Sequence, residues 1–349
     1  MNASRSETDH SILEFIRENP LLSSKEIHDG AGLEIGYATL KRILQGLIAQ
    51  ELISISGRGK STKYAISRHY RLIHHIDVEN YFQKETDERN AGEYFDHELI
   101  AGTMSRNSLF TRNELDRLTM SQEEFRKRSA ELSTAEYKKE MERLAIDLSW
   151  KSSQIEGNTY SLLETERLLK EKETASGKTK EEADMLLNHK AALDFIIAHP
   201  DFVHPLTVAK VEDIHSILIK DLPIERNLRK RRVGISGTNY KPLDNEFQIK
   251  EALQEMCAVV NTRTEIFAKA LLVLALISYI QPFADGNKRT ARIISNAILM
   301  HNDHCPLSFR TVDSLEYKKA MLIFYEQNNI SAFKKIFIDQ FEFAVKTYF

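Results

Sequence analysis

The sequence predicts a mainly helical protein in two folded parts, and three observations carry this prediction. Glycine and proline are scarce, at 13 and 7 of 349 residues. Apolar residues recur at helical spacing through most of the chain, and the strict alternation of a half-buried strand is rare. The composition also changes after Ser67, where a compact segment gives way to a charged stretch and then to a long helical block. We therefore expect a first domain over residues 1–75, connecting helices over 76–110 and a helical domain over 111–349.

The bulk composition limits the possible partners and compartment. A formal net charge of -3 provides no global attraction to nucleic acid or to an anionic membrane, so only a local patch would supply it. Two distant cysteines exclude a disulfide scaffold and fit a reducing compartment. The polar N-terminus lacks the order of a signal peptide, and the longest apolar run, residues 270–280, is too short to span a bilayer. We expect a cytoplasmic protein without a membrane partner.

The first domain has a readable order of elements. "SILEFIRENP" is a helix stopped by Pro20, and "SSKEIHDGAG" opens with a capping serine and ends in glycine. "GYATLKRILQGLIAQELI" carries apolar residues at helical spacing, and "ISISGRGKSTKYAIS" has two short alternating runs around a glycine-rich turn. Three helices and a hairpin in this order resemble a winged helix-turn-helix, an α+β fold.

A basic patch on this domain suggests a nucleic-acid partner. No acidic residue occurs between Glu51 and Asp77. Lysine and arginine on a recognition helix and on a wing suit DNA phosphates and base edges. The residues expected to contact DNA are Thr39, Lys41, Arg42, Arg58, Lys60 and Lys63. The alternative is that the domain binds protein and that its cations are only solvated.

The stretch "QPFADGNKRTAR", residues 281–292, has the physical features of a phosphate site. Pro282 ends a buried helix, and a turn at residues 285–287 precedes a new helix from Lys288. Free backbone N–H groups and the positive end of the helix dipole then point into the turn. Arg289 and Arg292 share one side of the helix, and Asp285 is a hard oxygen ligand beside the anion, as Mg²⁺ prefers.

This stretch resembles the signature of the Fic (Fido) family, His-Pro-Phe-x-Asp/Glu-Gly-Asn-Gly/Lys-Arg-x-x-Arg, at eight positions. "ISGTNYKPL", residues 235–243, resembles the family's flap, a small β-hairpin over the site. "PLSFRTVDSLEYKKAMLIFYEQNN" resembles the segment that closes the nucleotide pocket. "SSQIEGNTYSLLETERLL" resembles the inhibitory helix, here expected near residues 135–157. The resemblance covers about Phe110 to the C-terminus.

The resemblance implies a helical domain that binds ATP with Mg²⁺ and transfers AMP to a serine, threonine or tyrosine hydroxyl of a protein target or of the chain itself. Asp285 would hold the metal. The expected nucleotide-binding residues are Phe283, Gly286, Asn287, Lys288, Arg289, Arg292 and Tyr317. The expected regulatory residues are Ser152, Glu156 and Gly157, with Glu156 paired to Arg292. The expected target-docking residues of the flap are Ile235, Gly237, Thr238 and Tyr240.

One position departs from the family pattern in a way that affects the chemistry. The catalytic histidine that opens the signature is replaced by Gln281. An amide does not titrate, so it cannot act as the general base that histidine provides. We expect a protein that binds nucleotide and transfers AMP poorly. Three alternatives remain open: a DNA-binding regulator whose inactive Fic-like domain senses nucleotide, a full adenylyltransferase that recruits a base from elsewhere, and, because of Lys288, a Doc-like phosphotransferase.

Overall fold

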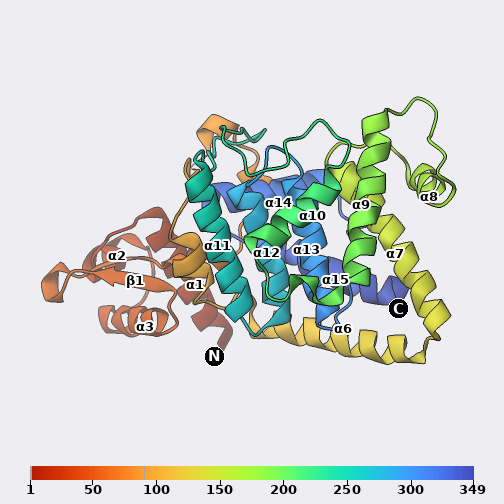
Figure 1. Ribbon diagram of the computed structural model, residues 1–349. Coiled ribbons are helices and arrows are strands. Elements are labelled where there is room, and N and C mark those ends of the chain that lie inside the picture. Colours follow the sequence, from red (N-terminus) through yellow and green to blue (C-terminus); the bar gives the residue numbers. More distant parts are fainter. Residues whose placement is uncertain (1, 90) are drawn as a thin grey trace. The chain divides into compact units, whose positions relative to one another are not determined.

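The computed structural model describes residues 2–89 and 91–349 and divides into two compact units, Met1–His75 and Ile76–Phe349 (Figure 1). Helices dominate both units, and the described residues contain one sheet of two strands. The predicted fold class, mainly α, is confirmed. None of the helices in the described ranges is long and apolar enough to cross a bilayer. Residues 76–110, expected as a connecting segment, are part of the second unit.

The first unit consists of short helices and one hairpin. In chain order its elements are α1 (Asn2–Glu18), α2 (Ser24–Gly30), α3 (Tyr37–Ala49), β1 (Ile53–Ser56), the turn η1 (Gly59–Ser61), β2 (Lys63–Ile66) and α4 (Arg68–Ile73). The strands are antiparallel, with Ile53 opposite Ile66. Leu22, between α1 and α2, adds a single bridge to Tyr64 on the other edge of β2.

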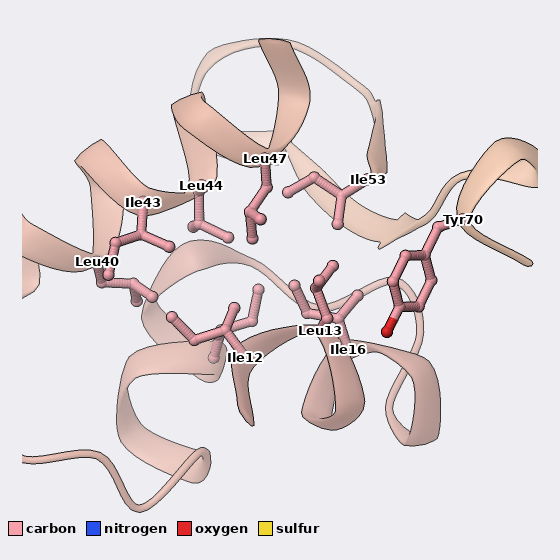
Figure 2. Close-up of a cluster of buried hydrophobic side chains, with 10 residues drawn as sticks. Ile12, Leu13, Ile16, Leu40, Ile43, Leu44, Leu47, Ile53 and Tyr70 are labelled. Carbon is pink, nitrogen blue, oxygen red and sulfur yellow. The ribbon is translucent and has the colours of Figure 1, made fainter. Parts of the chain in front are cut away.

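Apolar side chains from α1, α3 and β1 meet in one core in the first unit (Figure 2). The buried members are Ile12, Leu13, Ile16, Ile27, Leu40, Ile43, Leu44, Leu47, Ile53 and Tyr70. Four of them lie on α3 at the helical spacing that the sequence indicates. Because this face is turned inward, Lys41 and Arg42 of α3 are exposed.

The second unit is a helical assembly. In chain order its elements are α5 (Val78–Tyr81), η2 (Thr86–Glu88), η3 (Leu99–Met104), α6 (Arg112–Glu131), α7 (Thr134–Ile155), α8 (Leu162–Glu171), α9 (Lys180–Ala198), η4 (Pro200–Val203), α10 (Val208–Leu218), α11 (Glu246–Thr262), α12 (Ile266–Ile280), α13 (Asn287–His301), α14 (Ser314–Gln327) and α15 (Ser331–Tyr348).

Helix α12 is the centre of the second unit. Its residues from Phe267 to Ile280 are buried, Lys269 apart, as the sequence pattern indicates for a helix that is apolar on all sides. It packs against α11, α13, α14 and α15, and Figure 1 shows it among these helices. The loop after its last turn is therefore held on a rigid support, and this loop carries the signature motif.

Capping boxes set where several of the helices begin. In each, a serine or threonine accepts a bond from the backbone N–H three residues later, and a glutamate there accepts from the capping residue in return. The capping residues are Ser23, Thr111, Ser133, Ser161 and Thr179. The box at Ser133 starts α7, which runs to Ile155 and leaves Glu156 as its C-terminal cap. The inhibitory helix expected near residues 135–157 is therefore a regular helix that ends just before Glu156.

The hairpin predicted for the flap is wrong. Residues 235–243 form an extended loop without paired strands, and their one bridge joins Lys241 to Tyr94. Residues 89 and 93, far earlier in the chain, bind the backbone groups of the flap that a second strand would bind. Arg89 Nη2 donates to Gly237 O at 2.6 Å, and Lys241 N donates to Glu93 O at 2.7 Å. Because these partners come from residues 86–93, the flap is held open as a loop.

The first-unit core provides a test of the fold. Leu44 is 1% exposed on α3. Leu44→Ala should lower the free energy of unfolding of the first unit by about 2 to 5 kcal/mol, because it leaves a cavity among well-packed side chains. Urea unfolding of the full chain, followed by hydrogen exchange in α1 and α3, measures this change. Gln45→Ala, on the exposed face of the same helix, is the control and should alter stability by less than about 0.5 kcal/mol. Equal effects of the two changes would contradict this core.

Candidate functional site

The signature loop joins α12 to α13 through two residues in left-handed backbone conformation. Gln281 caps α12 with a φ of 51°, and Gly286 caps α13 with a φ of 81°. A Cβ at Gly286 would lie 3.2 Å from the ring of His215, so glycine is required there for both backbone and space. The helix begins at Asn287, one residue before the predicted start.

The side chain of Asn287 ties the loop together from within. Its Oδ1 accepts from Phe283 N at 2.9 Å, and its Nδ2 donates to Phe283 O at 2.8 Å and to Gln281 Oε1 at 2.9 Å. Below the loop, the ring of Phe283 stacks on His215 at 3.6 Å. The Nε2–H of His215 donates to Asp285 O at 3.0 Å. Burial lowers the pKa of His215 to about 4, so its ring is neutral at pH 7. These contacts fix the loop's backbone.

Arg229 braces the same loop from the other side, and the sequence analysis missed it. Its Nε donates to Gln281 O at 2.6 Å, and its backbone N–H donates to Pro282 O at 3.0 Å. Its side chain is fully buried. Burial lowers the pKa of its guanidinium, and the backbone carbonyls that it contacts satisfy its N–H groups. In the sequence, Arg229 is one of several neighbouring lysines and arginines, and nothing in this run indicates that one of them is buried.

The amide of Gln281, at the position of the family histidine, is engaged on both sides. Its Nε2 donates to Ser278 O at 2.6 Å and lies 3.5 Å from the hydroxyl of Tyr325. Its Oε1 accepts from Asn287. Burial raises the pKa of the Tyr325 hydroxyl far above its ordinary value, so this neighbour is also protonated. At this point of the loop, no group takes up a proton at neutral pH.

The two signature arginines are both buried, and Asp285 is exposed. Asp285 Oδ1 accepts from Gly286 N at 2.6 Å, and its Oδ2 is 3.3 Å from Arg289 Nη2. The side chain of Asp285 is 59% exposed, whereas that of Arg289 is fully buried. Two further nitrogens of Arg289, Nε and Nη1, have no hydrogen-bond partner among the described residues, nor has Nη1 of Arg292. Unpaired buried donors of this kind are rare and call for a partner from outside the chain, such as water or an anion.

Glu156 at the end of α7 pairs with two cations of α13. Its Oε1 is 3.0 Å from Arg292 Nη2, as expected, and its Oε2 is 3.0 Å from Lys288 Nζ, which the sequence analysis did not anticipate. Arg292 also donates from Nε to Ser152 Oγ at 2.8 Å and from Nη2 to Ser152 O at 2.9 Å. The next residue, Gly157, has a φ of 97° and turns the chain away after the cap.

The charges around Glu156 decide its ionisation. Burial alone would raise the pKa of this carboxyl, but the cations of Arg292 and Lys288 outweigh burial and lower it below its ordinary value. The same two cations offset the unfavourable position of a carboxylate at the negative end of the α7 dipole. Glu156 is therefore a carboxylate at neutral pH, and Arg292 is held by α7.

A cavity of about 440 Å³ opens between the signature loop, the end of α7, the flap and α14. The expected site residues that line it are Glu156, Gly157, Ile235, Gln281, Asp285, Asn287, Lys288 and Tyr317. Tyr317 lies under Arg292, with 5.4 Å between its ring centre and the guanidinium carbon. No histidine is among the residues found to line this cavity in the described part of the chain.

Several expected site residues lie beside the cavity rather than in it. Phe283 is buried below the loop, which corrects its assignment to nucleotide contact: stacking on His215 takes up its ring. In the flap, Gly237 contacts Arg89, and Thr238 Oγ1 accepts from Tyr240 N at 3.1 Å. Tyr240 is buried and donates to Tyr279 O at 3.0 Å. Of the four flap residues, Ile235 alone is among the residues described around the cavity.

In the first unit, the expected DNA-contacting residues differ in exposure and in ion pairing. The side chains of Lys41 and Arg42 on α3 and of Arg58 and Lys60 around η1 are exposed. Thr39 is half-buried. Lys63 pairs with a glutamate of α2 at 2.8 Å and is partly taken up by this contact. The interaction lowers the pKa of that carboxyl, which belongs to Glu26, to about 2.

The comparisons with known proteins agree with this geometry. Residues 205–299, which contain the flap and the signature loop, match the Fic/DOC family model. Residues 205–299 are therefore similar to the Fic/DOC family. The chain is similar to the protein adenylyltransferase Fic of Aedes aegypti, at 28% identity over 162 residues, which is 44% of this chain and 32% of the relative. It is also similar to fic-1 of Caenorhabditis briggsae, at 26% identity over 170 residues. The chain therefore matches about a third of the length of these relatives.

Solved structures show the same fold in the Fic domain. Fic-1 of C. elegans, residues 134–508, superimposes with a TM-score of 0.59 at 20% identity over 68% of this chain and 72% of that one. A Fic domain protein from Bacteroides thetaiotaomicron has a TM-score of 0.56 at 18% identity over 66% of this chain and 95% of that one. At these identities the likeness concerns the fold.

The Glu156 pair makes a testable prediction about stability. Glu156→Gln leaves the buried guanidinium of Arg292 without its anion, so the free energy of unfolding should fall by about 3 to 5 kcal/mol. Because the carboxyl's pKa is lowered in the folded protein, its stabilisation is present above its unfolded pKa and is lost as pH falls through the lowered folded pKa. The gap between wild type and variant should therefore close on acidification below 4.5, measured by urea unfolding across pH.

A matched control uses an exposed ion pair. Glu166→Gln removes the 2.6 Å contact with Lys170 on the surface of α8 and should cost less than about 1 kcal/mol. Tripolyphosphate should raise the melting temperature of Glu156→Gln more than that of wild type, because the anion replaces the missing carboxylate. Equal losses for the two variants, with no response to tripolyphosphate, would contradict a buried ion pair at Glu156.

Proposed function

We propose that this protein binds ATP with Mg²⁺ at the signature loop and is an adenylyltransferase-like protein whose AMP transfer to protein hydroxyls is slow. The observation that carries the proposal is the loop itself. It presents a helix N-terminus and an exposed aspartate to the cavity, with two buried arginines behind them and an engaged amide at the place of the base. The names of the curated relatives, protein adenylyltransferases, support the reaction class.

The residues present fit a polyphosphate. The first turn of α13 has free backbone N–H groups at the cavity, and the helix dipole adds positive potential there. The unpartnered nitrogens of Arg289 supply further donors below the loop. Lys288 lines the cavity beside them. We assign the α- and β-phosphates to the N-terminus of α13 with Arg289, and the γ-phosphate to Arg292.

The residues also fit Mg²⁺ held jointly with phosphate. Mg²⁺ commonly binds through one or two carboxylates, substrate phosphates and water. Asp285 is the exposed carboxylate at the loop, and it lies directly before the anion-binding turn. When bound, the ion would neutralise charge on the phosphates and orient them. Asp285 would hold it, and Arg289 would keep the carboxylate in place.

The missing step is removal of a proton from the attacking hydroxyl. Gln281 accepts from Asn287 and donates to Ser278, so neither end of its amide takes up a proton. His215 is neutral, but its Nε2–H points to Asp285 O below the loop. Positioning and electrostatics remain, while general-base help, typically worth about 10²- to 10⁴-fold, is lost.

Glu156 would regulate the binding of the nucleotide rather than the removal of the proton. While it holds Arg292 and Lys288, a γ-phosphate must compete with a carboxylate for the same cations. ATP would then bind more weakly and in a displaced position. Ser152, which also accepts from Arg292, keeps the guanidinium directed at α7.

The base assignment is tested by restoring the histidine. Gln281→His should raise AMP transfer, to an added protein or to the chain itself, by about 10²-fold or more. Intact-mass spectrometry after incubation with ATP and Mg²⁺ measures it. Glu156→Gly in the same background should raise transfer further, because Arg292 becomes free for the γ-phosphate. Arg289→Ala in that background should reduce it, because charge-assisted bonds worth about 1.5 to 3 kcal/mol each are lost.

Gln281→Asn is the matched control, since it changes the side chain without adding a titratable group. No gain from Gln281→His, with ATP affinity unchanged by calorimetry, would show that the defect lies elsewhere. AMP transfer by the wild-type chain at the rate of Gln281→His would favour a base recruited from another part of the protein. An added phosphate in place of AMP would favour the Doc-like reaction, in which the nucleotide is reversed.

A second candidate function, DNA binding, rests on the first unit. We propose that this unit is a winged helix-turn-helix with α3 as the recognition helix and the β1–β2 turn as the wing. Arg58 and Lys60 are exposed at the tip of the hairpin, and Lys41 and Arg42 are exposed on α3. Cations at these two places suit phosphate contacts on both sides of a groove. In that case the Fic domain would act as a nucleotide sensor on a regulator.

Charge reversal tests DNA binding. Arg58→Glu with Lys60→Glu should abolish binding of the full chain to a random-sequence duplex and reduce the salt dependence by about one unit of slope per lost phosphate contact. Fluorescence anisotropy at several salt concentrations measures both. Arg126→Glu with Lys127→Glu, on the exposed side of α6, makes the same change of charge elsewhere. If wild type shows no salt-dependent binding to any duplex, the first unit has another role.

A further inference from the structure

A second groove runs from the signature loop along the segment before the flap. Its volume is about 360 Å³, and Pro223, Ile224 and Val233 form its apolar part. Its charged lining consists of Glu225, Arg229, Lys230, Arg231, Arg232 and Asp285. Ala284 and Asp285 of the signature loop lie at one end, and these two residues also line the cavity of the proposed ATP site. A chain that lies in this groove would therefore bring a side chain to the point where transfer is proposed.

The segment along this groove is strongly basic. Between Arg226 and Leu243 there are six lysines and arginines and no acidic residue. Arg229 is turned inward and braces the signature loop, so it is not available to a ligand. The remaining cations lie at the surface, as expected for a surface that binds anions.

Three of these five cations are partly neutralised and two are not. Lys230 is 3.3 Å from Glu246, Arg232 is 2.7 Å from Asp244, and Lys241 is 3.0 Å from Glu93. The side chains of Lys230 and Arg232 are more than two-thirds exposed, so these two ion pairs are weak, and a ligand carboxylate can replace the present partner. Arg226 and Arg231 are exposed and have no ion pair with the residues that the structure describes.

We infer that this groove, lined by residues 223–225, 229–233, 284 and 285, docks an acidic segment of the protein target next to the modified hydroxyl. This inference rests on the proposed function and names its substrate class. Arg231 in the groove contacts a carboxylate of the segment, Arg226, next to the lining residue Glu225, contacts a second one at the edge of the groove, and the apolar floor takes up an adjacent side chain. A polypeptide suits this groove better than a nucleic acid, because apolar residues line it together with the cations and the described lining contains no aromatic ring on which a base would stack.

Acidic residues in the target also agree with the charges at the site. Asp285 and Glu225 would repel a carboxylate in the groove. If Asp285 held Mg²⁺, its charge would be compensated, and the exposed cations of residues 226–232 would outnumber Glu225. Docking would then be stronger with nucleotide and Mg²⁺ bound than without them, and electrostatic steering would raise the rate of association.

The test uses a labelled peptide and the full chain. The probe is a short fluorescein-labelled peptide with one serine between glutamates, and its partner has glutamines in place of the glutamates. Anisotropy should show that the glutamate peptide binds about tenfold or more tightly than the glutamine peptide and that added salt weakens it. Arg226→Glu with Arg231→Glu should remove the preference, and Arg226→Gln with Arg231→Gln should reduce it.

Arg126→Glu with Lys127→Glu is the control of equal charge change and should leave peptide binding unchanged. Circular dichroism and melting temperature show that each variant is folded. Equal affinity for the two peptides, or equal loss in both reversal variants, would overturn the inference. So would displacement of the peptide by a single-stranded oligonucleotide at far lower concentration, since the groove would then bind nucleic acid.

The same measurement separates this inference from the proposed function. Peptide binding requires no transfer, so it is read out in wild type regardless of the role of Gln281. If Gln281→His transfers AMP but shows no preference for acidic peptides, the groove assignment fails and the function stands. If the acidic peptide binds through Arg226 and Arg231 but Gln281→His remains inert, docking stands and the transfer reaction fails.

Discussion

The ion pair between Arg292 and Glu156 joins two helices whose contacting residues are 136 positions apart in the chain. The guanidinium of Arg292 is fully buried, and α7 supplies both a carboxylate and the oxygens of Ser152 to it. A buried cation without an anion costs several kcal/mol, so the end of α7 is needed to stabilise the free protein. In the proposed function, the same cation also binds the γ-phosphate. Stability without nucleotide and affinity for nucleotide would then be opposed at one residue, and Lys288 would favour stability without nucleotide.

In the proposed function, the signature loop binds nucleotide but lacks the base for catalysis. Its backbone is held by Asn287 within the loop, by His215 below it and by Arg229 beside it. None of these contacts needs a titratable group at position 281. A glutamine there even joins the network, because its amide matches the carbonyl of Ser278 and the amide of Asn287 at once. The loop thus combines a helix N-terminus with a side chain at position 281 that does not titrate, as the proposed function requires.

The flap beside the loop is held by segments outside the family-matched range. Arg89 and Glu93, from the stretch that follows the first unit, hold the flap by its backbone. Arg89 is in turn paired with Glu326 of α14 at 3.3 Å in a buried position. The flap therefore depends on two distant parts of the chain. The basic segment before the flap, residues 226–232, is by contrast mostly exposed. The flap is therefore held in place, while charged side chains beside it face solvent.

The sequence by itself determined the helical class, the capping serine of α2, the buried helix α12 and the residues of the signature loop. These features depend on periodicity and turn chemistry within a few residues, which a single chain displays directly. The pairing of Glu156 with Arg292 also followed from the sequence, but only through the family resemblance. Tertiary structure alone decided that Lys288 shares this carboxylate, that Arg229 is buried, that Phe283 lies below the loop and that the flap is no hairpin. Each of these depends on which distant segment takes a given hydrogen-bonding group or charge, and local sequence carries no record of that choice.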